Sequence, residues 1–197
     1  MTPAERLHEI AALRQNAIDY WYRVDHEGGA GVSEMFVADG VFHAGPGDPL
    51  VGRAAIEAFY AWRRDRGTRT SRHIVTNFHT AFDGARKART TCVMILYATD
   101  GTPPHSGTEA AMVADMVDDC VKGDDGVWRY ARRDFVPLYL SEAVLTIAPD
   151  SRRTGDEAGG TEITTKSAAH RKLRAEMGRS APHRIRPRHP VRPSRGR

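Results

Sequence analysis

Apolar residues recur at helical spacing along the first part of the chain. Positions three and four residues apart share one helix face, so this stripe predicts a helix from about Pro3 to Val24. Thr2 is suited to cap it, and Pro3 fits the first turn. The segment HEGGAG ends the pattern. The stripe consists of Leu7, Ile10, Leu13, Ala17, Tyr20 and Trp21.

Two further helices are predicted before any long strand. A short one covers about residues 31–37, and a turn and short strand follow it in ADGVFHAG. The third begins near Arg53, after the loop GPGDPLVG, and stops before DRGTRT, where Gly67 is a typical helix terminator. The chain therefore starts with three helices.

From Arg69 onward the hydrophobic pattern changes to a period of two, which is typical of strands. Four long strands are expected, at about residues 69–82, 88–98, 108–121 and 127–138. The turn residues between them favour antiparallel connections. Helices followed by a strand meander indicate an α+β fold rather than alternating βαβ units. We expect a cone-shaped α+β barrel, with three helices packed on a curved, mostly antiparallel sheet and a pocket between the layers.

The first long strand carries a row of polar residues in RTSRHIVTNFHTAF. Strict alternation places His73, Asn77 and His79 on one face, together with Ser71 and Val75. This row either faces water or lines an enclosed site. On the last strand the same rule puts four residues on one face: Arg129, Ala131, Arg133 and Phe135.

Charge divides the chain into two parts. Residues 151–197 carry a net charge of about +9, and residues 1–150 about −5. The end of the chain, APHRIRPRHPVRPSRGR, has almost no core-forming residues, so it cannot bury enough apolar surface to offset its ordering entropy. We therefore predict a folded domain over residues 1–148 and a disordered Arg/Pro-rich basic tail over 149–197. Nucleic acid binding is not expected, except through that tail.

Composition excludes several other classes. No stretch approaches the roughly 18 apolar residues of a membrane span, and the charged N-terminus lacks the apolar core of a signal peptide. Cys92 and Cys120 lie in apolar strand patterns and are expected to be buried free thiols, which suits the cytoplasm. No histidine or cysteine spacing typical of a metal site occurs, and no phosphate-binding glycine loop. Neither a metal nor a cofactor is expected.

Six segments between about residues 3 and 145 occur in an order that resembles a known family: YRVDHEG, EMFVADGVFHAG, GRAAIEAFYAWRRDRG, RTSRHIVTN, AAMVADMVDDCV and DGVWRYARRDFVPLY. They resemble the SnoaL-like branch of the nuclear transport factor 2-like superfamily. This resemblance implies the cone fold and a homodimer formed through the exposed sheet face. It is less specific for activity, since the fold hosts dehydratases, isomerases, polyketide cyclases and pure binding modules.

The resemblance also implies a catalytic pair. Dehydratases of the superfamily share an Asp just past the first helix and a His on the first long strand, and the matching positions here are Asp25 and His73. Such a histidine can accept a proton next to a carbonyl or leaving group, while the carboxylate fixes its tautomer. The structural alternative is that Asp25 caps the short second helix or takes part in a turn before Gly28 and Gly29, and that His73 is a satisfied core histidine beside a dimer interface.

Four further residues are candidates for substrate binding. Tyr20 is the tyrosine of the first helix expected to face inward, and His43 is placed either at the cavity mouth or at an exposed strand end. Asn77 would donate to a substrate oxygen, or satisfy a backbone group. Arg133 matches a pocket position of the dehydrochlorinase-like members, with a surface or dimer salt bridge as the alternative. The acidic residues around Asp118 are expected to pair with arginines of the neighbouring strand.

Two functions follow from these observations. The first is a cofactor-independent lyase or isomerase, dehydratase-like or cyclase-like, which acts on a small apolar cyclic or polyketide-like substrate. The second is a non-catalytic ligand-binding or assembly module, similar to a dioxygenase β-subunit. A pocket filled by bulky side chains favours the second function, and an Asp25–His73 pair within hydrogen-bond reach favours the first.

Overall fold

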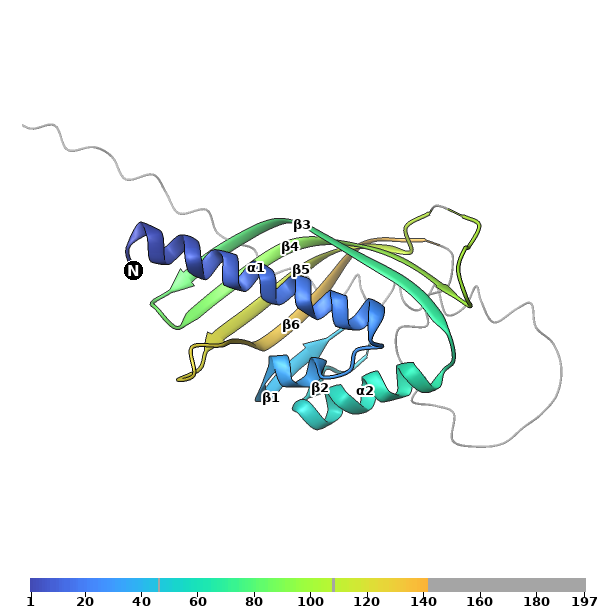
Figure 1. The fold of residues 1–197 in the computed structure, drawn as a ribbon, viewed down its shortest axis with the longest axis horizontal. Helices are drawn as coiled ribbons and strands as arrows, with labels where there is room; N and C mark the ends of the chain where they lie inside the picture. The colour runs from blue at the N-terminus through green and yellow to red at the C-terminus, as the bar shows by residue number, and fades with distance from the viewer. Residues whose placement is uncertain (46, 108, 142–197) are drawn as a thin grey trace, which may run out of the picture. The chain divides into compact units, whose positions relative to one another are not determined.

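A computed structural model describes residues 1–45, 47–107 and 109–141 of the chain. Two α-helices and a six-stranded sheet make up this part (Figure 1). The predicted disordered tail, 149–197, lies outside the described residues, as does the end of the predicted domain. Within the described residues, no helix is long and apolar enough to cross a membrane.

Helix α1 spans Pro3–His26 and begins with the predicted cap. The hydroxyl of Thr2 accepts a hydrogen bond from the backbone N–H of Glu5, and the Glu5 carboxylate accepts one from the backbone N–H of Thr2. This reciprocal arrangement satisfies two donors that a helix start leaves open. The helix runs two residues past the predicted end, so Asp25 lies in its last turn. Its buried face consists of Leu13, Ala17, Tyr20, Trp21 and Val24.

The prediction of three helices was wrong. The second is only a 3₁₀ turn, Val32–Met35, because the chain enters strand β1, Phe36–His43, directly after it. Helix α2, Arg53–Asp65, matches the third predicted helix, and Gly67 follows it with a positive φ of 101°. Such a backbone angle favours glycine, as the sequence indicated.

The sheet has the strand order β2-β1-β6-β5-β4-β3. Only β1 and β6 pair in parallel; the other neighbours are antiparallel. Figure 1 shows α1 lying across the curved sheet. Helix α2 lies beside β1 and β2, which form one edge of the sheet. The α+β prediction is thus confirmed, including four strands close to the predicted ranges. The strands after β1 are β2, Leu50–Val51; β3, Arg69–Asp83; β4, Lys87–Asp100; β5, Met112–Lys122; and β6, Trp128–Leu140.

A β-bulge interrupts β3 and breaks the predicted polar row. The pairing with β4 shifts between Thr76 and His79, so one extra residue is inserted there. Asn77 sits in the bulge with a φ of 56°, a left-handed conformation that Asn tolerates better than most residues. Beyond it the inward face changes from odd to even positions: His73 faces inward, whereas His79 is exposed.

A second register shift occurs where β5 pairs with β6, between Asp119 and Cys120, and inserts one extra residue in β6. The side chains of β6 therefore change from one face of the sheet to the other at this point. Trp128 and Tyr130 are buried before this shift, and Arg133 is buried after it. The prediction that Arg129, Ala131, Arg133 and Phe135 share one face was therefore wrong. An extra residue in a strand moves every later side chain to the opposite face.

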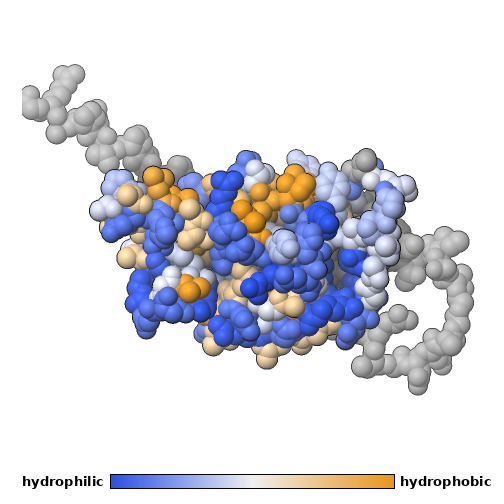
Figure 2. Space-filling view, viewed as in Figure 1, coloured by the Kyte–Doolittle hydropathy of each residue, from blue (hydrophilic) through white to orange (hydrophobic). Residues whose placement is uncertain are grey.

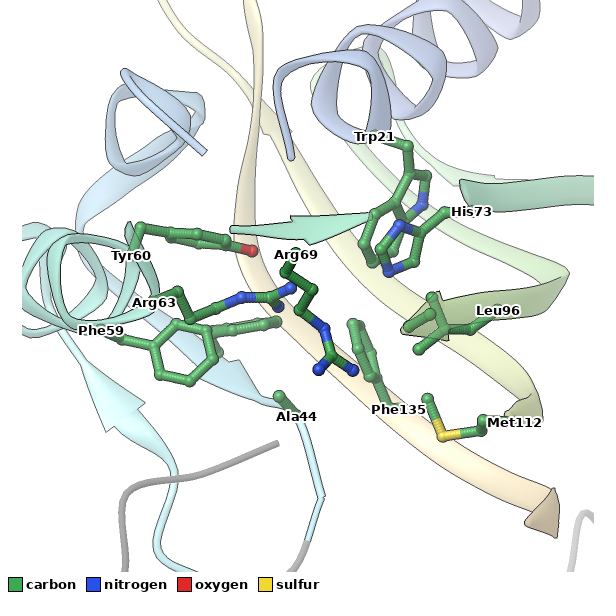
Figure 3. A pocket seen from close by; sticks show the side chains of 12 residues that line it. Trp21, Ala44, Phe59, Tyr60, Arg63, Arg69, His73, Leu96, Met112 and Phe135 are labelled. Atoms are coloured by element: carbon green, nitrogen blue, oxygen red, sulfur yellow. The ribbon is translucent and has the colours of Figure 1, made fainter. Parts of the chain in front are cut away.

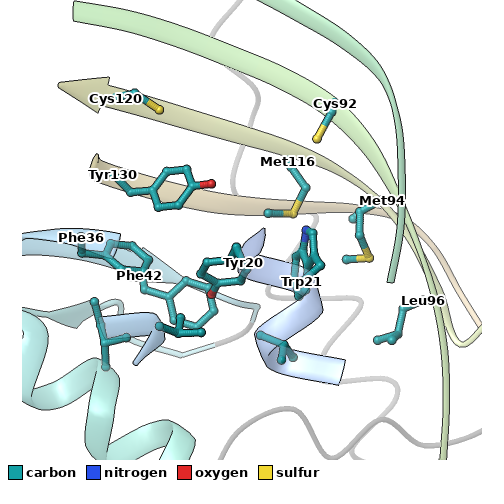
Figure 4. Close-up of a cluster of buried hydrophobic side chains, with 14 of the residues drawn as sticks. Tyr20, Trp21, Phe36, Phe42, Cys92, Met94, Leu96, Met116, Cys120 and Tyr130 are labelled. Carbon is teal, nitrogen blue, oxygen red and sulfur yellow. The ribbon is translucent and has the colours of Figure 1, made fainter. Parts of the chain in front are cut away.

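The core lies between the two helices, α1 and α2, and the inner face of the sheet (Figure 4). Methionines and small residues of β4 and β5 meet the aromatic residues of α1, β1 and β6. Cys92 and Cys120 are buried in this layer as free thiols, as predicted. Burial raises the pKa of the Cys92 thiol to about 12, so it behaves as a small apolar side chain rather than a nucleophile.

Candidate functional site

Asp25 and His73 are 48 residues apart in sequence but lie in direct contact. Asp25 Oδ1 and His73 Nδ1 are separated by 2.7 Å. Helix α1 extends far enough to bring Asp25 over the start of β3, and the inward facing of His73 before the bulge completes the contact. The side chains are 6% and 3% exposed, respectively, so the hydrogen bond is shielded from water.

Two further hydrogen bonds hold the Asp25 carboxylate in place. The Ser71 hydroxyl donates to Oδ1 at 2.7 Å, and the backbone N–H of His73 donates to Oδ2 at 2.8 Å. Burial alone would raise the pKa of Asp25, but the hydrogen bonds from His73 and Ser71 outweigh it and lower the pKa below its usual value. An ionised carboxylate can only accept hydrogen bonds, so the proton between the two residues belongs to Nδ1 of His73.

Burial lowers the pKa of His73 below its ordinary value. The Asp25 carboxylate opposes this change, and the positive charges of Arg63 and Arg69 add to it. The imidazole is therefore neutral at pH 7, with its proton on Nδ1 and a lone pair on Nε2. No described residue makes a hydrogen bond to Nε2.

Trp21 fixes the plane of the His73 ring. The two rings stack with centroids 3.9 Å apart and an interplanar angle of 14°. Trp21 and His73 form one wall of a pocket (Figure 3). Trp21 holds the ring on one side and the Asp25 carboxylate holds it at its edge, so the ring has a single orientation. A general base needs such a fixed orientation to accept a proton from a bound substrate.

The pocket is small and mostly apolar. Its cavity measures about 30 Å³, enough for one or two water molecules. A ring-sized ligand fits only if side chains at its edge move. The polar groups among its lining residues are His73, Arg63, Arg69 and the Tyr60 hydroxyl; its apolar lining is formed by Trp21, Phe42, Ala44, Phe59, Leu96, Ala98, Met112 and Phe135.

Tyr20 faces inward as predicted, but it does not line this pocket. Its hydroxyl is hydrogen-bonded to that of Tyr60, with 2.5 Å between the oxygens. Tyr60, on α2, is the tyrosine that lines the pocket. Burial raises the pKa of both phenols, so both keep their protons at pH 7. The sequence predicted the helix that carries Tyr60 but did not indicate a role for this residue at the site.

Arg133 is a core residue rather than a pocket residue. It donates two hydrogen bonds of 2.8 Å to Asp118 on the neighbouring strand. Its guanidinium carbon lies 4.1 Å from the ring centroid of Tyr20 and 3.9 Å from that of Tyr130. The predicted pairing of Asp118 with an arginine of the neighbouring strand is confirmed. The expected surface or dimer salt bridge of Arg133 was wrong, because the pair is buried in the core.

The two other candidate binding residues lie away from the pocket. His43 is at the end of β1, where Nε2 contacts the carbonyl of Gly47 at 3.2 Å and Nδ1 lies 3.6 Å from Asp134. It corresponds to the strand-end alternative. Asn77 is exposed in the bulge of β3, which turns it away from the side that carries His73.

Arg63 and Arg69 are pocket residues that the sequence analysis did not select. They flank the turn between α2 and β3, a segment considered only as a helix end. The available clue was their position on either side of Gly67. This glycine lies in the turn that joins α2 to β3, and both of these elements contribute to the pocket. In the described ranges, no three His, Cys, Asp or Glu side chains converge in a way that could hold a metal ion.

Comparison with known proteins agrees with this fold. The model of the SnoaL-like domain matches residues 5–134. A search among curated proteins found no match. Among solved structures, a Novosphingobium aromaticivorans protein provisionally assigned as a scytalone dehydratase has a TM-score of 0.64 at 19% identity, covering 78% of this chain and 100% of its own.

Two other solved structures have the same fold. A Catenulispora acidiphila protein in complex with S-DNPA has a TM-score of 0.58 at 23% identity, covering 66% of this chain and 94% of its own. ActVI-ORFA from Streptomyces coelicolor has a TM-score of 0.59 at 17% identity, covering 68% and 98%. Identities this low show the fold alone, but the domain match spans most of the described residues. The chain belongs to the SnoaL-like domain family, as its six sequence segments predicted.

Proposed function

We propose that the protein is a cofactor-independent lyase or isomerase, of the dehydratase or cyclase type, with His73 as its general base. The observation that carries this proposal is the 2.7 Å contact between Asp25 and His73, together with the unoccupied Nε2 of His73 on the pocket wall. A neutral imidazole in this position can remove a proton next to a carbonyl group. Asp25 then stabilises the imidazolium without taking up the proton itself.

Tyr60 is the proposed electrophilic partner. Its hydroxyl remains protonated, and Tyr20 supports it through the hydrogen bond between the two phenols. A phenol at the pocket wall can donate to the oxygen on which negative charge develops when the base removes the proton. The protonated His73 can return its proton to a leaving hydroxyl, which gives elimination, or to another carbon, which gives isomerisation.

The similarity to a scytalone dehydratase-like structure suggests a test substrate, a hydroxytetralone. This cyclic β-hydroxy ketone loses water to give a naphthol, which can be followed by its absorbance. His73→Ala should lower kcat/KM roughly 10²–10⁴-fold, the usual contribution of a general base. His79→Ala is the matched control, since His79 lies on the same strand but is exposed. Equal activity of wild type and His73→Ala would overturn the proposal.

The alternative, a ligand-binding module without catalysis, is favoured by one observation. The side chains that line the pocket fill most of the space between α1, α2 and the sheet and leave a cavity of only about 30 Å³. This function predicts that small cyclic ketones bind without turnover. In that case the chemical composition of the hydroxytetralone would be unchanged after long incubation with the protein.

We also propose that the protein forms a homodimer in the cytoplasm. Ile74, Tyr97 and Val136 are exposed, and each directly follows a residue that lines the pocket. Alternation along a strand therefore places all three on the outer face of the sheet. Figure 2 shows other apolar residues scattered among polar ones on the face that carries α1. A mass from light scattering of about 22 kDa rather than twice that value would contradict the dimer.

A further inference from the structure

Two arginines enter the pocket from the turn that joins α2 to β3. Arg63 lies near the end of α2, and Arg69 is the first residue of β3. Figure 3 shows both side chains extending into the pocket, with the Arg63 guanidinium beside Tyr60 and the Arg69 guanidinium toward Ala44 and Phe135. The proposed proton transfer uses neither of them. Two cations beside a mostly apolar cavity therefore need another explanation.

The charge of Arg63 has no acidic partner among the described residues. Its guanidinium carbon lies 5.9 Å from the ring centroids of Phe59 and Tyr60, and it makes no ion pair or hydrogen bond there. The next residue of the helix, Arg64, in contrast forms an ion pair with Glu57. Stacking on aromatic faces leaves all five N–H donors of Arg63 open to a ligand.

The charge of Arg69 is only partly balanced. Its Nη1 donates to Asp100 Oδ1 at 2.6 Å, but the Asp100 side chain is 69% exposed and also lies near Arg66. Water screens an exposed carboxylate of this kind, so it neutralises Arg69 incompletely. The other carboxylate near the pocket, Asp25, is already engaged by His73 and Ser71. The cavity thus carries an excess of positive charge.

From this charge and the aromatic lining we propose that the substrate is a small aromatic or alicyclic carboxylic acid. Its carboxylate would be held by Arg63 and Arg69, and its ring by Phe59, Phe135 and the Trp21 side of the pocket. This inference rests on the proposed function, because it assigns the substrate class of the same site. A guanidinium matches a carboxylate through two parallel hydrogen bonds, which gives both affinity and orientation.

The small cavity is compatible with such a ligand. Arg63 rests on aromatic faces without hydrogen bonds, so displacing it breaks no strong contact. The carboxylate of an entering acid would draw the Arg63 side chain to the edge of the pocket, and the apolar ring would take the vacated space. A neutral ligand of the same shape offers no such compensation. An acid should therefore bind more tightly than a neutral ligand of the same shape, although the neutral ligand can still enter.

Calorimetry with naphthoate and its neutral amide, naphthamide, tests the proposal. The wild-type protein should bind naphthoate at least tenfold more tightly than naphthamide. Arg63→Met keeps the apolar stem and removes the charge, so it should abolish this preference, while Arg63→Lys should retain part of it. Arg72→Met is the control, because Arg72 is exposed on the outer side of β3, next to His73 in sequence. It should leave both affinities unchanged.

The outcomes separate this proposal from the proposed catalysis. His73→Ala should keep the preference for naphthoate even if it loses all turnover, because the arginines alone bind the carboxylate. Equal binding of acid and amide by the wild type, or binding of neither, would overturn the assignment of an acid substrate. An unchanged preference in Arg63→Met would overturn the role of Arg63. Neither result bears on whether His73 is the base.

Discussion

Two buried acid–base pairs lie on the inner side of this sheet, and they differ in one respect that matters for chemistry. Asp25 pairs with His73 beside the pocket, and Asp118 pairs with Arg133 in the core. Both pairs join groups from different elements, and both are shielded from water. Histidine changes its charge near neutral pH, whereas arginine keeps its proton at any pH at which the protein is folded.

The surroundings of the two pairs differ in the same sense. The rings of Tyr20 and Tyr130 lie against the Arg133 guanidinium, which is 0% exposed and does not line the pocket. His73 has its partner on one edge and leaves the other nitrogen at a cavity wall. Burial and pairing alone therefore do not indicate catalysis in this fold. The indication is a proton acceptor that has a fixed tautomer and an open side.

The largest expected effect comes from Asp25→Asn. Asn can satisfy its surroundings by donating its amide N–H to Nδ1 of His73, which moves the histidine proton to Nε2 and removes the base. We expect kcat/KM for the hydroxytetralone to fall roughly 10³–10⁴-fold, as in triads with the wrong tautomer. Nitrogen NMR of the His73 ring would show the change of tautomer directly. A variant that retains the Nδ1–H form and full activity would contradict this account.

Substitution in the core pair should change the stability of the protein rather than its activity. Asp118→Ala leaves the Arg133 charge buried without a counter-ion, which typically costs about 3–5 kcal/mol of unfolding free energy. Asp119→Ala is the matched control: its partner Arg89 lies on the surface, with side chains 41% and 62% exposed. We expect that change to be below about 1 kcal/mol in urea titrations. Similar losses of unfolding free energy in both variants would mean that the buried pair contributes no more to stability than the surface pair.

The pH dependence should separate the pairs further. Because burial lowers the pKa of His73, the unfolded chain takes up this proton first as the pH falls below about 6.5. Stability should then decrease, by at most about 1.4 kcal/mol per pH unit, until the folded-state pKa is reached. Activity should decline only at that lower pH, where the base itself becomes protonated.

This slope should belong to His73 alone. His73→Ala should flatten the dependence of unfolding free energy on pH below about 6.5, whereas His79→Ala should retain it. Arg133 cannot contribute, since its charge does not change in this range. If His73→Ala leaves the slope unchanged, then another histidine is responsible for it.

The smallest expected effect concerns the bulge that separates His73 from His79. Asn77 has a φ of 56°, and Val at this position would be strained by roughly 1–2 kcal/mol. Gly should be tolerated within about 1 kcal/mol. Thermal unfolding of the two variants measures this difference. Equal stability of Asn77→Val and Asn77→Gly would show that the bulge does not depend on this residue.

Much of the fold could be predicted because its signals are local. The cap at Thr2, the stripe of α1, the stop at Gly67 and the period-two strands each depend on residues near one another in the sequence. The short second helix was misjudged for the same reason. Its few apolar residues suit a helix locally, but pairing with β6 draws the chain into strand β1 from Phe36 onward. Tertiary pairing overrides a weak local preference.

The sequence by itself determined the family, the order of the two α-helices and the four long strands, and the identity of the Asp25–His73 pair, because a motif survives as a pattern of residue types. Only the tertiary structure decided which side chains meet the pocket. Single-residue shifts in β3 and β6 turned Asn77 outward and Arg133 into the core, and the turn after α2 brought Arg63 and Arg69 to the cavity. A bulge forms through pairing between strands, so its position is a property of the sheet and not of either strand alone.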